Sequence, residues 1–147
     1  MKGKKIFTLG LVALLSLGTL ATTASAADYK DKAFSFYVDK KTKETESYTK
    51  YEKSSVYIHI TEGSLDYARV QAYGYINGKW QNKTVGTTAF VPVGPDKSAK
   101  SRIRTTIIES TNGAATSVKL KFPKNEYASV VGGVWSPDCA GNYPAVN

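Results

Sequence analysis

The sequence predicts an all-β fold, a single antiparallel β-sandwich of about seven or eight strands, with a small β-barrel as the alternative. Short runs of alternating apolar and polar residues recur throughout residues 27–147, which is the pattern of strands that bury one face. Two Asn-Gly pairs, Asn77-Gly78 and Asn112-Gly113, lie between such runs, and this pair favours the two-residue turn of a β-hairpin. No helical apolar stripe occurs in the same range. We therefore expect strands joined by tight turns.

Residues 1–26 have the three-part pattern of a secretory signal peptide. Lysines among the first five residues precede an apolar run over residues 6–20, and small residues end at Ala26, after which we expect cleavage. The apolar run is too short for a transmembrane helix to be the better interpretation. The predicted organisation is a signal peptide over residues 1–26 and one all-β domain over residues 27–147. The protein is expected to be secreted, free or associated with the wall, without a transmembrane anchor.

The same alternation places the strands along the domain. We predict them over residues 33–38, 54–61, 89–93 and 127–135, and in two hairpins over residues 66–85 and 100–122. Pro92 suits an edge strand or a bend, and Gly132-Gly133 predicts a bulge or close packing. Residues 39–53 carry many charges of both signs, so they are expected to form a solvated loop or an exposed edge strand. Asp138 is interpreted as part of the turn that ends the last strand.

The first Asn-Gly pair fixes a hairpin register. The predicted pairs are Ile76 with Lys79, Tyr75 with Trp80, Tyr73 with Asn82, and Val70 with Val85. Because side chains alternate along a strand, the face toward the core would carry Ala68, Val70, Ala72, Gly74, Ile76 and Val85. The opposite face would carry the aromatic candidates Tyr67, Tyr73, Tyr75 and Trp80. These rings either stack on the sugar rings of a bound carbohydrate or brace the hairpin by packing on each other.

The second Asn-Gly pair predicts a second hairpin in the same way. The expected pairs are Ile107 with Val118, Thr105 with Leu120, and Ile103 with Phe122, so that apolar residues meet on one face. The other face would then set Arg104 opposite Lys121 and Thr106 opposite Lys119, with Lys100 and Arg102 farther along. Like charges placed directly across a hairpin destabilise it modestly, which suggests that this face presents them to an anion.

The chain has a net charge of +8, of which Lys2, Lys4 and Lys5 contribute three, and within residues 27–147 the excess of basic residues lies downstream of residue 78. The candidate anion-binding residues are Lys100, Arg102, Arg104, Lys119 and Lys121. For an exported protein, the expected partners are an anionic wall polymer or an anionic lipid surface. No specific nucleic-acid partner is expected, because no nucleic-acid-binding motif accompanies the charge. The alternative is that these side chains only keep the surface soluble.

The sequence offers little chemistry for an enzyme. Its one histidine, His59, is expected on the outward side of a strand, and no nucleophile-elbow motif accompanies it. One histidine and one cysteine do not make a zinc site, so neither a metal nor a cofactor is predicted. Cys139 is the only cysteine, so it is expected either to be buried or to form a disulfide with another chain. A Cys139–His59 pair would need the fold to bring the two together.

The segment 33–38 after the signal peptide, the Tyr-rich middle, and the ending Gly133-Val134-Trp135-Ser136-Pro137-Asp138 resemble an uncharacterised family of small exported proteins of Bacillus-type bacteria. The resemblance covers most of residues 27–147 and implies a small exported protein of Gram-positive bacteria. It carries no catalytic residue to this chain.

Three hypotheses for function follow. The first is a secreted non-enzymatic β-domain that binds an anionic cell-envelope polymer through the basic hairpin face, with carbohydrate binding through the Tyr/Trp face as a variant. The second is a bacteriocin-like or other antagonistic exported protein, for which small size, export and basic charge are the indications. The third is a hydrolase that uses His59 as its base.

Overall fold

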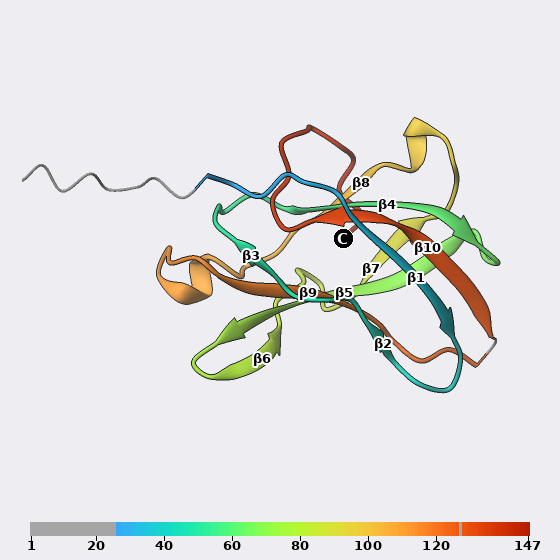
Figure 1. Ribbon diagram of the computed structural model, residues 1–147, viewed down its shortest axis with the longest axis horizontal. Helices are drawn as coiled ribbons and strands as arrows, with labels where there is room; N and C mark the ends of the chain where they lie inside the picture. The colour runs from blue at the N-terminus through green and yellow to red at the C-terminus, as the bar shows by residue number, and fades with distance from the viewer. Residues whose placement is uncertain (1–25, 127) are drawn as a thin grey trace, which may run out of the picture.

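The computed structural model describes residues 26–126 and 128–147. The signal peptide predicted over residues 1–26 therefore lies outside the described residues, apart from Ala26. The described part contains ten strands and two short 3-10 turns (Figure 1). The strands are β1 (Lys32–Val38), β2 (Lys43–Glu44), β3 (Tyr48–Lys50), β4 (Val56–Gly63), β5 (Tyr67–Ile76), β6 (Lys79–Asn82), β7 (Ala89–Pro92), β8 (Ser101–Ile103), β9 (Thr116–Phe122) and β10 (Ser129–Ser136). The 3-10 turns are η1 (Lys97–Ala99) and η2 (Glu109–Thr111).

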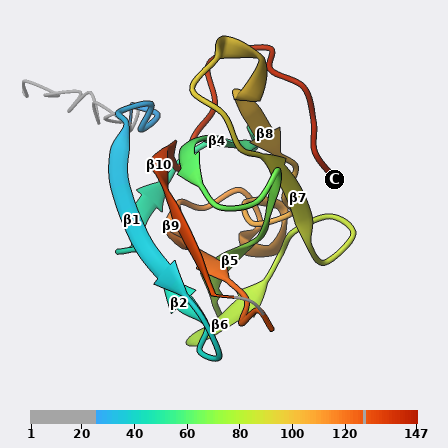
Figure 2. The ribbon, with the colours of Figure 1, turned by 90° about the vertical axis from the view of Figure 1, so that its right-hand side faces the viewer.

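The strands form two curled antiparallel sheets that face each other, as Figures 1 and 2 show. Sheet A has the order β1-β10-β4-β8. Sheet B has the order β2-β9-β5-β6, and β3 also pairs with β9 while β7 also pairs with β5. The all-β prediction is confirmed. The charged segment 39–53 supplies two short strands at the edge of sheet B, which raises the number of strands above the expected seven or eight.

The core lies between the two sheets and follows from the alternation of apolar residues. On β1, Phe34 and Val38 are buried and Phe36 packs beside them. Trp135 on β10 and Phe122 on β9 are the largest apolar side chains of the core, exposed by 1% and 2%. Burying such side chains stabilises the fold by about 1.5–3 kcal/mol each. Among the described residues, no helix has the length and apolarity that crossing a membrane requires.

The first five residues of β4, 56–60, are buried on both faces, which the sequence did not predict. Ile58 and its apolar neighbours face the core, but Tyr57 and His59 on the other face are also buried. The ring of Tyr57 stacks on Tyr143 at 4.9 Å between centroids, and His59 Nε2 lies 3.1 Å from the carbonyl oxygen of Gly94. The prediction that His59 is a surface residue is wrong, because the segments around residues 94 and 143 cover this side of sheet A.

The first hairpin forms around Asn77-Gly78 as predicted. Tyr75 pairs with Trp80, and the two neighbouring predicted pairs also form. Asn77 and Gly78 have φ angles of 51° and 77°, the left-handed values that this turn needs.

The predicted pairing of Val70 with Val85 is wrong, because Val70 pairs with Ala89 of β7. The ladder between β5 and β6 ends at the pair Tyr73–Asn82. Beyond it, Thr84 Oγ1 accepts the Ala72 N–H at 2.7 Å in place of a backbone carbonyl. The chain then turns back on itself, so that β7 takes the next place along β5.

The second predicted hairpin does not exist. Strand β8 pairs with β4 in sheet A, where Ile103 faces Val56, whereas β9 pairs with β5 in sheet B. Ile107 and Ile108 are consecutive and both buried, which no strand with one buried face allows. Asn112-Gly113 instead ends η2, and the Gly113 N–H donates to the Ile108 carbonyl at 2.9 Å. The same left-handed residue pair therefore closes a helical turn here.

Gly132-Gly133 marks a bulge in β10, as predicted, because the pairing of β10 with β4 shifts between these two residues. A Cβ atom on Gly133 would lie only 2.1 Å from the carbonyl oxygen of His59. Only glycine therefore fits at this point, where β10 runs between β1 and β4 in the centre of sheet A.

Candidate functional site

The outer face of sheet B brings together aromatic and basic side chains from three strands. Strand β9 contributes Lys119 and Lys121, and β5 and β6 contribute Tyr73, Tyr75 and Trp80. Register explains the arrangement: Tyr73 lies directly opposite Lys119, and Tyr75 lies directly opposite Trp80. We call these five residues the aromatic–cationic face.

Each lysine of this face lies over an aromatic ring. Lys119 Nζ is 4.4 Å from the centroid of the Trp80 ring, and Lys121 Nζ is 4.3 Å from that of Tyr73. Tyr75 and Trp80 meet edge to face with their centroids 5.3 Å apart. Cation–π contacts at exposed sites contribute about 0.5–1 kcal/mol each. They hold apolar ring surface and positive charge within a few ångströms of each other.

Glu44 on β2 lies between the two lysines and pairs with both of them. The Oε1 atom of Glu44 is 2.7 Å from Lys121 Nζ, while Oε2 pairs with Lys119. Hydrogen bonds from Lys119 and Lys121 lower the pKa of Glu44 below its ordinary value of 4.5. At neutral pH the group of two ammonium ions and one carboxylate therefore keeps a single positive charge.

The other predicted anion-binding residues lie on a different sheet. Arg102 and Arg104, on and just after β8, hold the C-terminal segment: Arg102 Nε donates to the Tyr143 carbonyl and Arg104 Nε to that of Asn147, both at 2.8 Å. Lys100 follows η1 immediately. The prediction of one basic hairpin face is wrong, because its two arms belong to sheets A and B. A role of each residue in anion binding stays a prediction.

Tyr67 does not belong to the aromatic–cationic face, although it lies on the same strand as Tyr73. The two are six residues apart, which is ~20 Å along an extended strand. Tyr67 lies instead near Phe90 at the opposite end of β5. The structure thus brings together three of the four aromatic candidates with two of the five basic ones.

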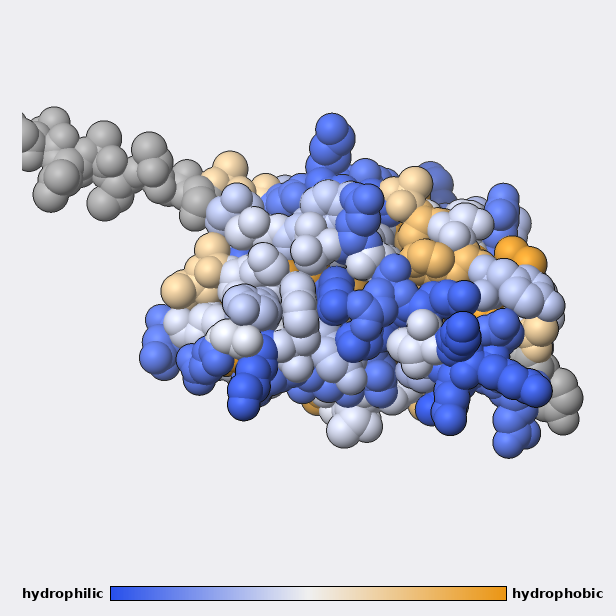
Figure 3. Space-filling view, turned by 60° about the horizontal axis from the view of Figure 1, so that its bottom comes forward, coloured by the Kyte–Doolittle hydropathy of each residue, from blue (hydrophilic) through white to orange (hydrophobic). Residues whose placement is uncertain are grey.

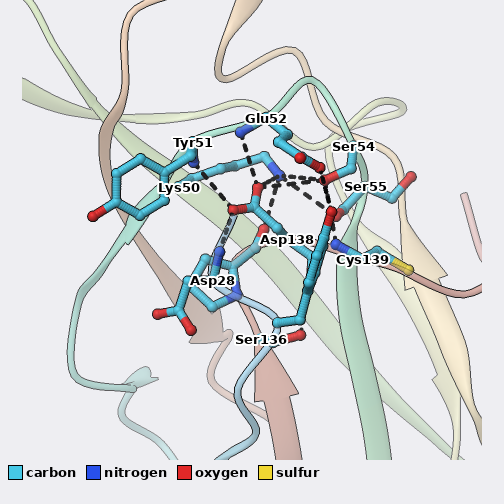
Figure 4. Close-up of polar contacts among 11 residues, drawn as sticks. Asp28, Lys50, Tyr51, Glu52, Ser54, Ser55, Ser136, Asp138 and Cys139 are labelled. Atoms are coloured by element: carbon cyan, nitrogen blue, oxygen red, sulfur yellow. Dashed lines mark hydrogen bonds and ion pairs between the residues drawn. The ribbon is translucent and has the colours of Figure 1, made fainter. Parts of the chain in front are cut away.

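A buried ion pair, which the sequence did not reveal, joins Lys50 at the end of β3 to Asp138 after β10 (Figure 4). Lys50 and Asp138 are both 0% exposed, and Lys50 Nζ lies 3.0 Å from Asp138 Oδ1. The ammonium also donates to the Pro137 carbonyl at 2.8 Å. Lysine is rarely buried without a partner, so the ion pair accounts for this position in the segment that was expected to be solvated.

The Asp138 carboxylate accepts three backbone N–H groups from two other segments. They belong to Asp28, Tyr51 and Glu52, at 2.9, 3.2 and 3.1 Å. Burial raises the pKa of Asp138, but the hydrogen bond from the Asp28 backbone and the charge of Lys50 outweigh that effect and bring the pKa below its ordinary value. Figure 4 shows these donors converging on the carboxylate, which ties the N-terminal segment and the β3–β4 loop to the end of β10. The interpretation of Asp138 as simple turn chemistry was incomplete.

Cys139 lies beside this buried pair but takes part in no nucleophile–base arrangement with His59 in the described residues. Its Sγ donates to the Gly141 carbonyl at 3.3 Å, whereas His59 contacts Gly94. Cys139 is half-buried and unpaired within the described chain, and burial raises the pKa of its thiol. No group of three or more potential metal ligands occurs in residues 26–126 and 128–147.

Comparison with known protein families shows which family the chain belongs to. The model of the family described as "Protein of unknown function (DUF2712)" matches residues 22–139. The chain belongs to the DUF2712 family. The match agrees with the resemblance to an uncharacterised family, and it extends over both the aromatic–cationic face and the Lys50–Asp138 pair of this DUF2712 protein. No curated protein and no solved structure matches the chain.

Proposed function

We propose that this DUF2712 protein is a secreted, non-enzymatic binding domain that holds an anionic, sugar-containing polymer of the cell envelope on the outer face of sheet B. The observation that carries the proposal is the meeting of Tyr73, Tyr75 and Trp80 with Lys119 and Lys121 on one face. The face combines aromatic candidates, which alone indicated a carbohydrate, with anion-binding candidates, which alone indicated an anionic polymer or lipid surface.

The chemistry of the face fits such a polymer. Aromatic rings offer an apolar surface against which the apolar side of a sugar ring can stack, and a tyrosine hydroxyl adds a polar group. An ammonium close to the ring can meet a phosphate or carboxylate on the same polymer. Tyr75 is 45% exposed, so this part of the face is open to a ligand. A sheet surface without a deep cavity suits an extended polymer better than a small molecule.

The non-enzymatic part of the proposal draws on the surroundings of His59 and Cys139. The His59 ring is buried against Gly94, and the raised pKa of Cys139 keeps its thiol protonated at neutral pH. A nucleophilic cysteine usually has the opposite shift, toward a lower pKa. Export rests on the predicted signal peptide over residues 1–26.

Retention of the protein on purified cell walls at low and high salt tests the proposal. A variant with Lys119→Gln and Lys121→Gln removes both cations of the face. A control with Lys53→Gln and Lys97→Gln removes the same charge from exposed positions elsewhere. We expect retention that declines with salt, because ions screen exposed charges. We also expect the Lys119/Lys121 variant to lose most of its retention while the control keeps it. Equal retention of the two variants would remove the face from the proposal.

A further inference from the structure

One end of the sandwich opens into an apolar cavity between the two sheets. Its volume is about 260 Å³. Buried residues of both sheets form its floor, namely Val38, Phe122 and Val131. Its rim carries Leu65, Tyr67, Phe90 and Val130, whose exposed fractions range from 43% to 59%. We call this site the end pocket.

The end pocket exists because sheet B is one strand short at this place. The last pairing of β9 with β5 joins Lys121 to Gln71, and β9 ends at Phe122 before Pro123, which has no backbone N–H for a ladder. Strand β5 continues beyond that pairing over residues 67–70, with β7 on its other side. Within the described residues, the side of β5 facing away from β7 therefore has no pairing strand over residues 67–70, next to the first residues of β10.

One basic side chain lines the end pocket, and two more lie in the hollow next to it. Arg69 lines both the end pocket and an adjoining hollow, which also contains Lys40, Lys124 and one acidic residue, Glu126. Arg69, Lys40 and Lys124 are exposed, and within the described residues none of them forms an ion pair. Figure 3 shows this end at the right, where apolar surface lies directly beside crowded hydrophilic side chains.

An apolar cavity beside three basic side chains and one acidic side chain, an excess of positive charge, is complementary to an amphiphile with an anionic head group. Exposed apolar rims of this kind mark binding sites more often than isolated apolar residues do. A methylene group is about as large as a water molecule, which occupies ~30 Å³. The cavity therefore holds about nine methylene groups, which matches one alkyl chain of medium length. Drug-sized ligands usually occupy about 300–1,000 Å³, which is more than this cavity offers.

We propose that the end pocket binds a free, single-chain fatty acid of medium length, with its chain between the sheets and its carboxylate against Arg69, Lys40 and Lys124. This site is separate from the aromatic–cationic face, which uses the opposite end of β5. A free fatty acid is favoured over a membrane surface because the floor of the site is recessed between the sheets.

Isothermal titration calorimetry of the protein with decanoate at low salt tests this proposal. We expect saturable binding of decanoate and at least ten-fold weaker binding of decyltrimethylammonium, which has the same chain and the opposite charge. Val130→Asp places a charge at the apolar rim and is expected to abolish binding. Arg69→Glu is expected to weaken binding by about ten-fold or more. Both side chains are exposed, so the variants should fold, which far-UV circular dichroism checks.

Lys97→Glu serves as the control, because it makes the same change of charge at an exposed position on η1. It should bind decanoate as the unaltered protein does. The proposal would be overturned if decanoate and decyltrimethylammonium bound equally well, or if Val130→Asp left the binding of decanoate unchanged. Association with phosphatidylglycerol vesicles but not with free decanoate would also overturn it. The Lys119→Gln and Lys121→Gln variant should still bind decanoate, so this test is independent of polymer binding.

Discussion

The Lys50–Asp138 pair predicts an unequal effect of removing its two partners. Lys50→Met keeps most of the side-chain volume but removes the ammonium. The Asp138 carboxylate then stays buried without its cation, although it still accepts three backbone N–H groups. Breaking a buried ion pair from one side costs about 3–5 kcal/mol. Because those hydrogen bonds remain, we expect Lys50→Met to lie near the lower end of that range.

Asp138→Asn should cost more. Both carboxylate oxygens accept hydrogen bonds: Oδ2 from the backbone of Asp28 and Tyr51, and Oδ1 from Glu52, Ser54 and Lys50. An amide offers only one oxygen, so its NH₂ group would face donors on one side. Each buried donor that is left unsatisfied costs about 1–3 kcal/mol, and the Lys50 charge also loses its partner.

Urea unfolding at pH 7, followed by tryptophan fluorescence, measures these effects as changes in the free energy of unfolding. Small domains have about 5–15 kcal/mol in total, so both variants should shift the midpoint strongly. The double variant should cost less than the sum of the two, with a coupling of about 0.5–3 kcal/mol. Lys53→Met, at an exposed lysine, is the control and should stay within about 0.5 kcal/mol. A loss below about 1 kcal/mol for Lys50→Met, or a larger loss for it than for Asp138→Asn, would refute this reasoning.

Three further predictions concern the pH, β10 and the aromatic–cationic face. The pKa of Asp138 is lower in the folded chain than its ordinary 3.8. The stabilisation from this carboxylate is therefore complete above about pH 4 and declines as the pH falls through the folded-state pKa. Urea unfolding midpoints measured between pH 2 and 6 check this, and a flat profile would contradict it. Gly133→Ala should destabilise the fold by about 1–3 kcal/mol or more, because the new Cβ meets the His59 carbonyl. The melting temperature checks this, and an unchanged value would show that β10 can move away. Glu44→Gln removes the one carboxylate between Lys119 and Lys121, so retention on purified walls at low salt should rise; a fall would mean that Glu44 is needed to position the lysines.

The two Asn-Gly pairs show what the sequence could predict and where its local pattern was insufficient. Both pairs adopt left-handed backbone angles. Around Asn77-Gly78 the residues alternate on both sides, and the hairpin formed in the predicted register close to the turn. Before Asn112-Gly113, Ile107 and Ile108 interrupt the alternation, and this was the sign that the turn does not join two paired strands. Giving that interruption more weight than the Asn-Gly pair would have separated β8 from β9.

The features that the sequence did not predict depend on contacts between distant segments. Lys50 lies within a run of charges and Asp138 within a turn, so neither residue alone indicates burial, and they are 88 residues apart in the chain. The end pocket arises where β9 ends before β5 does, which becomes visible only once β9 is known to pair with β5. The aromatic–cationic face depends on that same pairing, which is why its two halves were predicted as separate sites.

The most direct test of polymer binding is a map of amide chemical-shift changes when a soluble anionic wall polymer is added to the isotope-labelled protein. The account predicts that the largest changes occur on β5 and β6 around Tyr75 and Trp80 and on β9 around Lys119, and that they diminish with added salt. Changes concentrated on β8 and the C-terminal segment, around Arg102 and Arg104, would contradict it.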